Sequence, residues 1–110
     1  MKKAKEYLFS YGILQKEKFQ LEVLGRLLQG ETDSLRGYKL SLFEIKEHLI
    51  AAGHHPMAMP TGDKTDIVDG TVFEISKQDL ELLDSYKIND YKRIREVLES
   101  GKQAWVYVAV

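Results

Sequence analysis

The sequence predicts an α+β fold, because runs of strand-forming residues are separated by only two helical segments. The patterns described below give about six strands and two short helices. This number of strands is compatible with a sheet that closes, or nearly closes, into a small barrel. The 110 residues contain no internal repeat and no linker-like stretch, so we expect residues 1–110 to fold as a single domain.

The N-terminal part of the chain is predicted to contain a strand, a helix and a second strand. Aromatic residues alternate over residues 7–11, which is the period of a strand with one aromatic face, and Gly12 ends this run. Apolar side chains at helical spacing predict a short helix over residues 15–24. Apolar and polar residues alternate again over residues 35–45, which predicts the next strand.

The middle of the chain contains the strongest loop signals. Residues 48–59 are ambiguous, and Pro56 would restrict any strand there to the edge of a sheet. Residues 60–66 combine Pro, Gly, Asp and Thr, which indicates a loop. Residues 67–75 are predicted to be a strand. The glycine inside this strand, Gly70, is typical of a bulge or of close approach by another backbone.

The C-terminal part predicts a helix followed by a hairpin. Ser76 with Asp79 three residues later is a capping signature, so we expect a helix to start at Ser76. Residues 91–98 and 103–110 are predicted to be strands, joined by a turn in which Gly101 is free to adopt a positive φ. The final strand is rich in β-branched and aromatic residues, so we expect it to be central in the sheet.

Composition excludes several classes of function. The formal net charge is −1, so no field of either sign attracts nucleic acid or an anionic membrane. The absence of cysteine removes disulfides, thiol catalysis and cysteine-ligated zinc. No apolar run approaches the roughly 20 residues that span a bilayer. We therefore expect a cytoplasmic protein that binds neither nucleic acid nor membrane.

The three histidines do not form a metal-binding pattern. They are His48, His54 and His55. A metal site needs three or four converging ligands, whereas adjacent histidines on a strand point to opposite faces. We expect no metal site and no other cofactor.

Two segments concentrate polar groups. The first is the turn from Tyr11 to Leu14, where a strand ends in glycine and leads directly into a helix. Such a turn exposes several backbone N–H groups that can hold a carboxylate or another anion. The second is the polar segment 84–91, which follows the capped helix. On pattern alone, a tight connection without a ligand and a solvated loop remain the simpler interpretations.

Taken together, these segments resemble the γ-glutamylcyclotransferase-like family. Its N-terminal turn has Tyr-Gly-(Thr or Ser)-Leu, and this chain has Tyr11, Gly12 and Leu14 there, with Ile13 where a hydroxyl is usual. Its second segment has Leu-Asp-x-Tyr-Glu and then Tyr-x-Arg. The residues that match it are Leu83, Asp84, Tyr86, Tyr91 and Arg93. The resemblance extends from Tyr7 to Val108 and implies a γ-glutamylcyclotransferase-like mixed αβ barrel.

The resemblance also implies where a site lies. The N-terminal turn is implied to hold the γ-glutamyl part of a substrate, with pocket tyrosines nearby. The residues implied to bind substrate are Tyr11, Gly12, Ile13, Leu14, Tyr91 and Tyr107. The family's catalytic acid/base is the glutamate that follows Tyr86. In this chain that position is Lys87.

Lys87 changes the chemistry that the family performs. In the family's reaction the α-amino group of a γ-glutamyl amine attacks its own γ-carbonyl, which yields 5-oxoproline and a free amine. A carboxylate can accept the α-ammonium proton, but a lysine with a pKa of about 10.4 is protonated at pH 7 and repels that ammonium. General acid/base catalysis is typically worth ~10²–10⁴-fold. We therefore expect weak or absent activity and a pocket that prefers small carboxylate ligands.

Two alternatives remain open from the sequence. One is an active enzyme on another amide substrate, with Lys87 as base or nucleophile, or with a neighbouring carboxylate (Asp84, Asp90 or Glu81) in the role of the glutamate. The other is a non-catalytic interaction module whose final strand pairs with another chain. In each case we expect a monomer or a weak homodimer.

Overall fold

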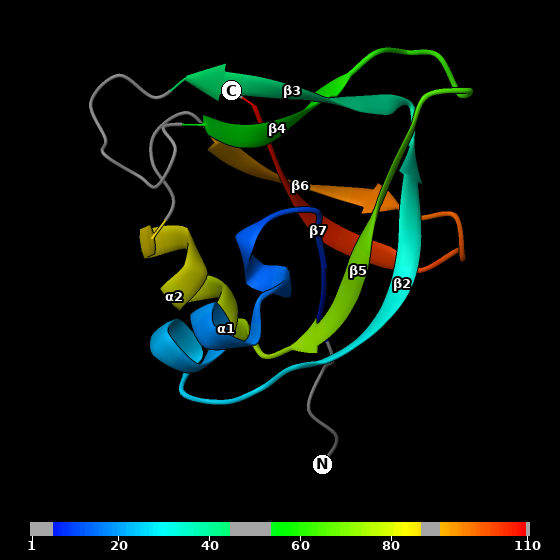
Figure 1. The fold of residues 1–110 in the computed structure, drawn as a ribbon. Coiled ribbons are helices and arrows are strands. Elements are labelled where there is room, and N and C mark those ends of the chain that lie inside the picture. The colour runs from blue at the N-terminus through cyan, green and yellow to red at the C-terminus, as the bar shows by residue number, and fades with distance from the viewer. Residues whose placement is uncertain (1–5, 45–53, 87–90, 110) are drawn as a thin grey trace.

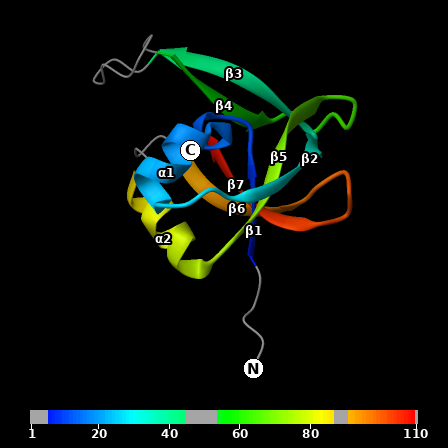
Figure 2. The same ribbon diagram turned by 60° about the horizontal axis from the view of Figure 1, so that its bottom comes forward.

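The computed structural model describes residues 6–44, 54–86 and 91–109, which form one mixed β-sheet with helices packed on one face (Figures 1 and 2). The strands in these residues are β1 (Glu6–Ser10), β2 (Gln29–Arg36), β3 (Tyr38–Glu44), β4 (His54–Pro60), β5 (Ile67–Ile75), β6 (Tyr91–Val97) and β7 (Gln103–Ala109). The helices are the 3₁₀ turn η1 (Ile13–Gln15), α1 (Glu17–Leu24) and α2 (Lys77–Tyr86).

The α+β class predicted from the sequence is confirmed. Within the described residues the sheet has seven strands rather than about six, in the order β2-β5-β1-β7-β4-β3, with β6 paired to β7. The sheet is not closed into a barrel, because no pairing joins β2 to β3 in this part of the chain. The reason is that β2 and β3 meet end to end at Gly37, whose φ is 83°, and not side by side (Figure 1).

Strand β2 is the element that the sequence pattern did not predict. Its side chains are mostly polar and exposed, and only Leu35 is buried. It is a strand because it pairs with β5 along its whole length, from Gln29 opposite Glu74 to Arg36 opposite Ile67. The predicted strand over 35–45 was therefore wrong at its start, since Leu35 belongs to β2. Partner strands, and not local propensity, decide this element.

Strand β4 corrects the expectation that Pro56 restricts its strand to an edge. β4 lies between β3 and β7 in the sheet. Its pairing with β7 is confined to Ala58 opposite Val108, whereas its pairing with β3 runs the length of the strand. Backbone N–H groups alternate in direction along a strand, so the nitrogens of Pro56 and Pro60 face β7, as that of Ala58 does. The missing N–H groups are thus on the side where little pairing occurs.

The two faces of the sheet bury separate apolar clusters. On the helix-covered face, Leu8 and Ile75 pack with Leu80 and Leu83 of α2. On the opposite, inner face, Phe9 packs in a cluster that spans β2, β3, β4, β5 and β7. Adjacent residues of β1 therefore enter different clusters, as the period of a strand requires.

The capping signature at Ser76 forms as predicted. The Ser76 hydroxyl accepts the N–H of Asp79 at 3.1 Å, and the Asp79 carboxylate accepts the N–H of Ser76 at 2.9 Å. Arg26, which follows α1, also pairs with Asp79 and links the two helices. No helix in the described ranges has the length and apolar composition needed to cross a bilayer.

The glycines predicted to matter do so for different reasons. Gly101 has a φ of 92° in the turn between β6 and β7, which confirms the predicted hairpin. Gly70 permits close approach by β1, because a Cβ there would lie 2.4 Å from the carbonyl oxygen of Ser10. The final strand is central, as predicted, since β7 pairs with β1, β4 and β6.

Candidate ligand site at the junction of β1, β4 and β7

One edge of β7 is shared by two strands. β1 pairs with β7 in parallel at Trp105 and Val106, and β4 takes over the same edge at Val108. At this point β1 ends at Ser10 and the chain turns away into η1. We call the turn of residues 11–14, together with the neighbouring parts of β4 and β7, the junction. The N-terminal motif therefore lies where two strands meet the edge of a third.

The turn after Tyr11 is held by hydrogen bonds to its carbonyl groups. The Gly12 carbonyl accepts the Gln15 N–H at 3.1 Å and the Gln15 side-chain amide at 3.3 Å. The Leu14 carbonyl accepts the side-chain amide of the buried Gln20 at 2.7 Å. A 3₁₀ bond reaches back three residues, so the N–H groups of Ile13 and Leu14 have no acceptor inside the turn. The turn can therefore donate hydrogen bonds to an anion.

Tyr11 joins β7 to β4 through its hydroxyl. The hydroxyl donates to the carbonyl of Tyr107 at 2.5 Å and accepts the N–H of Ala58 at 2.9 Å. Burial raises the pKa of Tyr11 to about 12, the Ala58 N–H opposes this rise, and the nearby Tyr91 adds to it. The phenol is therefore neutral at physiological pH.

Asp84, near the end of α2, forms a charged network with β6 and β7. Its carboxylate accepts two hydrogen bonds from the Arg93 guanidinium, at 2.9 and 2.8 Å, and one from the Tyr107 hydroxyl at 2.5 Å. Burial works to raise the pKa of Asp84, but these hydrogen bonds and the charge of Arg93 hold that pKa below its usual value. We call the set Asp84, Arg93 and Tyr107 the brace.

The brace is itself supported by stacking and burial. The Arg93 guanidinium lies over the ring of Trp105, 4.3 Å from its centroid, in the range of cation–π contacts. Burial, followed by the hydrogen bond and the charge of Asp84, raises the pKa of Tyr107 well above its usual value. In the chain Asp84 lies near the end of α2 and Arg93 near the start of β6, so the brace joins these two elements.

The structure brings together most of the residues predicted to form a site. Leu14 and Tyr107 share one apolar cluster with Tyr91 packed against it, and Tyr11 contacts the backbone of Tyr107. Gly12 is the next residue of the turn, and Ile13 is described for its backbone alone. Lys87 lies outside the described residues, as does Asp90, so its role stays a prediction.

Sequence reasoning missed one participant of the junction. The N–H of Ala58 meets Tyr11 across 47 positions of the chain, and no motif contains Ala58. The available signal was the placement of a proline two residues before and two residues after it, which leaves Ala58 as the donor among positions 56, 58 and 60. Arg93 and Asp84 were noted as motif residues, but their pairing was not predicted.

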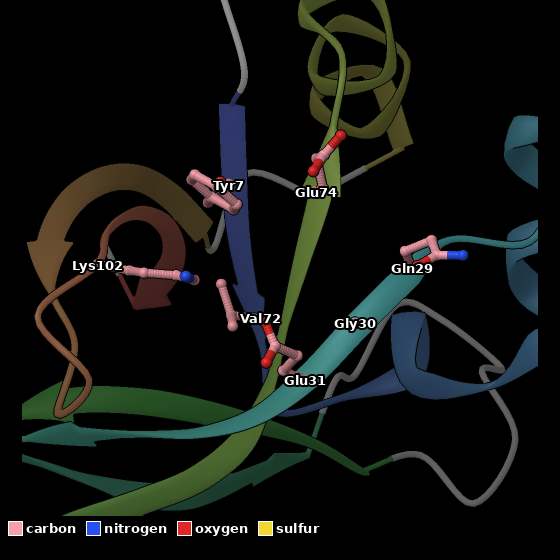
Figure 3. A pocket seen from close by; sticks show the side chains of 7 residues that line it. All are labelled: Tyr7, Gln29, Gly30, Glu31, Val72, Glu74 and Lys102. Carbon is pink, nitrogen blue, oxygen red and sulfur yellow. The ribbon is translucent and has the colours of Figure 1, made fainter.

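A separate hollow of about 190 Å³ lies on the inner face of the sheet (Figure 3). Its lining residues are Tyr7, Gln29, Gly30, Glu31, Val72, Glu74 and Lys102. The Lys102 ammonium lies 5.3 Å from the centroid of the Tyr7 ring. Tyr7 and Tyr11 are four residues apart on an extended chain, or about 13 Å. The hollow is therefore distinct from the junction, and no sequence motif points to it.

The described ranges contain no group of three or more His, Asp or Glu residues placed to hold a metal ion. The carboxylate of the brace, that of Asp84, accepts hydrogen bonds from Arg93 and Tyr107. The described residues of the junction and the brace offer backbone N–H groups, phenols and the Asp84–Arg93 pair.

Comparisons with known proteins were made for the sequence and for the fold. Residues 8–110 match the family model described as gamma-glutamyl cyclotransferase, AIG2-like. No protein with a curated description matches the sequence.

Three of the similar solved structures represent the fold. A protein of Arabidopsis thaliana solved in solution has a TM-score of 0.75 and 21% identity, with 99% of this chain and 64% of that chain covered. A protein named gamma-glutamyl cyclotransferase has a TM-score of 0.71 and 19% identity, with coverages of 97% and 68%. An AIG2-like protein from Mus musculus has a TM-score of 0.66 and 23% identity, with coverages of 96% and 78%. The chain thus spans less than two thirds of the first of these proteins, and at these identities the likeness shows a shared fold.

We expect Asp84→Asn to lower the free energy of unfolding at pH 7 by roughly 1–2 kcal/mol, because it removes a charged partner of Arg93 at a partly exposed site. Folding lowers the pKa of Asp84, so the ionised carboxylate stabilises the fold above the ordinary carboxylate pKa. This stabilisation is lost as the pH falls through the folded-state pKa. Urea unfolding between pH 7 and pH 3 should therefore show a difference from the unmodified protein that shrinks in acid.

The matched control is Glu81→Gln, which neutralises an exposed carboxylate on the same helix. We expect it to change the free energy of unfolding by less than about 0.5 kcal/mol. Equal losses in the two variants, or a loss in Asp84→Asn that does not depend on pH, would contradict the brace.

Proposed function

Because the chain belongs to the gamma-glutamyl cyclotransferase, AIG2-like family, we propose that it binds small carboxylate ligands at the junction and has weak or no cyclotransferase activity. The observation that carries this proposal is the turn of residues 11–14. Its Gly12 and Leu14 carbonyls are bonded within the protein and its Gly12 N–H donates to the Ser10 hydroxyl, whereas the N–H groups of Ile13 and Leu14 have no acceptor in the turn. Such donors suit a carboxylate. Lys87, where the family has its glutamate, supplies the reason for low activity.

The proposed loss of activity follows from proton transfer. In ring closure a bond forms between the α-nitrogen and the γ-carbonyl carbon, and the bond from that carbon to the leaving nitrogen breaks. One proton must leave the α-ammonium, and the leaving nitrogen must gain one. A carboxylate can do both, whereas a lysine ammonium has no lone pair to accept the proton. It also repels the substrate ammonium, so both binding and chemistry are disfavoured.

Asp84 is poorly suited to replace the missing glutamate. Both of its oxygens accept hydrogen bonds from Arg93, and one also accepts from Tyr107. Its pKa is held below the usual value, which makes it a weaker base than an ordinary carboxylate. A general base works best with a pKa near the operating pH. This arrangement favours the binding role over the alternative in which Asp84 performs catalysis, and the same alternative for Asp90 or Glu81 stays a prediction.

The interaction-module alternative is also disfavoured. It requires that the final strand offer a free edge to another chain. In the described residues β7 pairs with β6 along one edge and with β1 and then β4 along the other. The cytoplasmic location, the monomeric or weakly dimeric state and the lack of nucleic-acid binding stay predictions.

We expect glutarate, a diacid of the γ-glutamyl length without its ammonium, to stabilise the protein against heat. A ligand at ~100 times its Kd stabilises a fold by ~2.7 kcal/mol, which raises the Tm of a small domain by several degrees. Glutaramide has the same length without charge and should give little effect. Thermal shift with both compounds is the measurement, and equal responses to both would contradict a carboxylate site.

We expect Lys87→Glu to create or raise release of 5-oxoproline from a γ-glutamyl amine, by up to the ~10²–10⁴-fold that general acid/base catalysis provides. Chromatographic detection of 5-oxoproline is the measurement. Lys39→Glu, which makes the same charge change at an exposed position on β3, is the control and should give no gain. A folded Lys87→Glu variant with no gain would show that the chemistry is lost for more than one reason.

A further inference from the structure

We infer that Tyr11 is a positioning residue, and that its hydroxyl completes the sheet between β4 and β7 instead of contacting the ligand. The register carries this inference. In a parallel pair with Ala58 opposite Val108, the Ala58 N–H is directed at the carbonyl of Tyr107. These are the two groups that the Tyr11 hydroxyl engages, at 2.9 and 2.5 Å. A side chain from the turn after β1 thus bonds to both the N–H and the carbonyl that would otherwise face each other between β4 and β7.

The sequence of β4 makes this contact hard to replace. Along the edge that faces β7, positions 56 and 60 are prolines and have no N–H to donate. Ala58 is the donor between them, and it is fully buried. An unpaired buried N–H is costly, so removal of its acceptor should loosen the contact of β4 with β7 at Ala58, which we call the seam. Tyr11 therefore supports the pairing of β4 with β7 at Ala58, in addition to the burial of Ala58 and Val108 in the inner-face cluster.

The Tyr11 hydroxyl has no second proton with which to donate a hydrogen bond to a ligand. A phenol carries a single O–H donor, and that of Tyr11 is directed to the Tyr107 carbonyl. Its raised pKa, about 12, keeps that proton in place at physiological pH. The next residue, Gly12, begins the turn that presents the N–H groups of Ile13 and Leu14. Fixing the phenol to β4 and β7 therefore fixes where the turn begins, and through it the direction of these donors.

The test compares two tyrosine-to-phenylalanine variants that each remove one hydroxyl from the sheet. Tyr11→Phe removes the seam contact, and Tyr38→Phe removes a contact to Glu96 that ties the same β3–β4 hairpin to β6. Amide hydrogen exchange by NMR reports the Ala58 N–H directly. We expect exchange at Ala58 to accelerate by about tenfold or more in Tyr11→Phe and by less than about threefold in Tyr38→Phe.

The second measurement, the Kd of a ligand, shows whether Tyr11 positions the ligand site or only stabilises the fold. This part rests on the proposed function, and its probe is glutarate. We expect the Kd of glutarate to rise by about tenfold in Tyr11→Phe and to be unchanged in Tyr38→Phe. Faster exchange at Ala58 with an unchanged Kd would overturn the positioning role, and unchanged exchange at Ala58 would overturn the seam itself. If the unmodified protein does not bind glutarate, the proposed function fails, and the Ala58 exchange rate still decides whether the seam is as inferred.

Discussion

The rest of the structure depends on one edge of β7 being shared by two strands. β1 uses the edge as far as Val106, and β4 uses it at Val108. A strand that ends in the middle of a sheet must turn sharply away, and a turn at that place exposes backbone donors inside the fold and not at its rim. The Tyr-Gly motif makes this sharp turn possible. Tyr11 forms hydrogen bonds to the neighbouring strands β4 and β7, and Gly12 follows it in the turn.

The brace likewise uses side-chain hydrogen bonds to join separate elements of the fold, in this case α2, β6 and β7. Three of the residues that made the second segment recognisable have structural roles: Leu83 is buried in the core, and Asp84 pairs with Arg93, as it also does with Tyr107. Together they hold α2 and β6 at a fixed separation, and Lys87 is attached between them in the chain. This explains how a motif can persist around a changed residue, because its other members stabilise the scaffold whatever side chain stands at position 87.

Much of the fold was predictable from local signals. The capped helix at Ser76, the hairpin at Gly101 and the central final strand each depend on neighbouring residues, and each was confirmed. β2 was missed because its polar side chains show no alternation and its strand form is imposed by β5. The expectation that Pro56 restricts its strand to a sheet edge was wrong, because residue propensity does not tell which neighbouring strand a backbone nitrogen faces. The candidate site was also predictable only in part. Its resemblance to the family named Tyr11, Gly12, Leu14, Tyr91 and Tyr107. Ala58 was missed, because it joins the site through a long-range contact that no local pattern encodes.

We propose that the ligand is recognised at the junction and not at the hollow near Tyr7. The most direct test is a titration of the isotope-labelled protein with glutarate, followed through its backbone amide signals by NMR. We expect the largest shifts at Gly12, Ile13 and Leu14, with smaller ones at Ala58 across the seam. Shifts concentrated instead at Gln29, Glu31 and Lys102 would place the ligand in the hollow of Figure 3 and contradict the proposal.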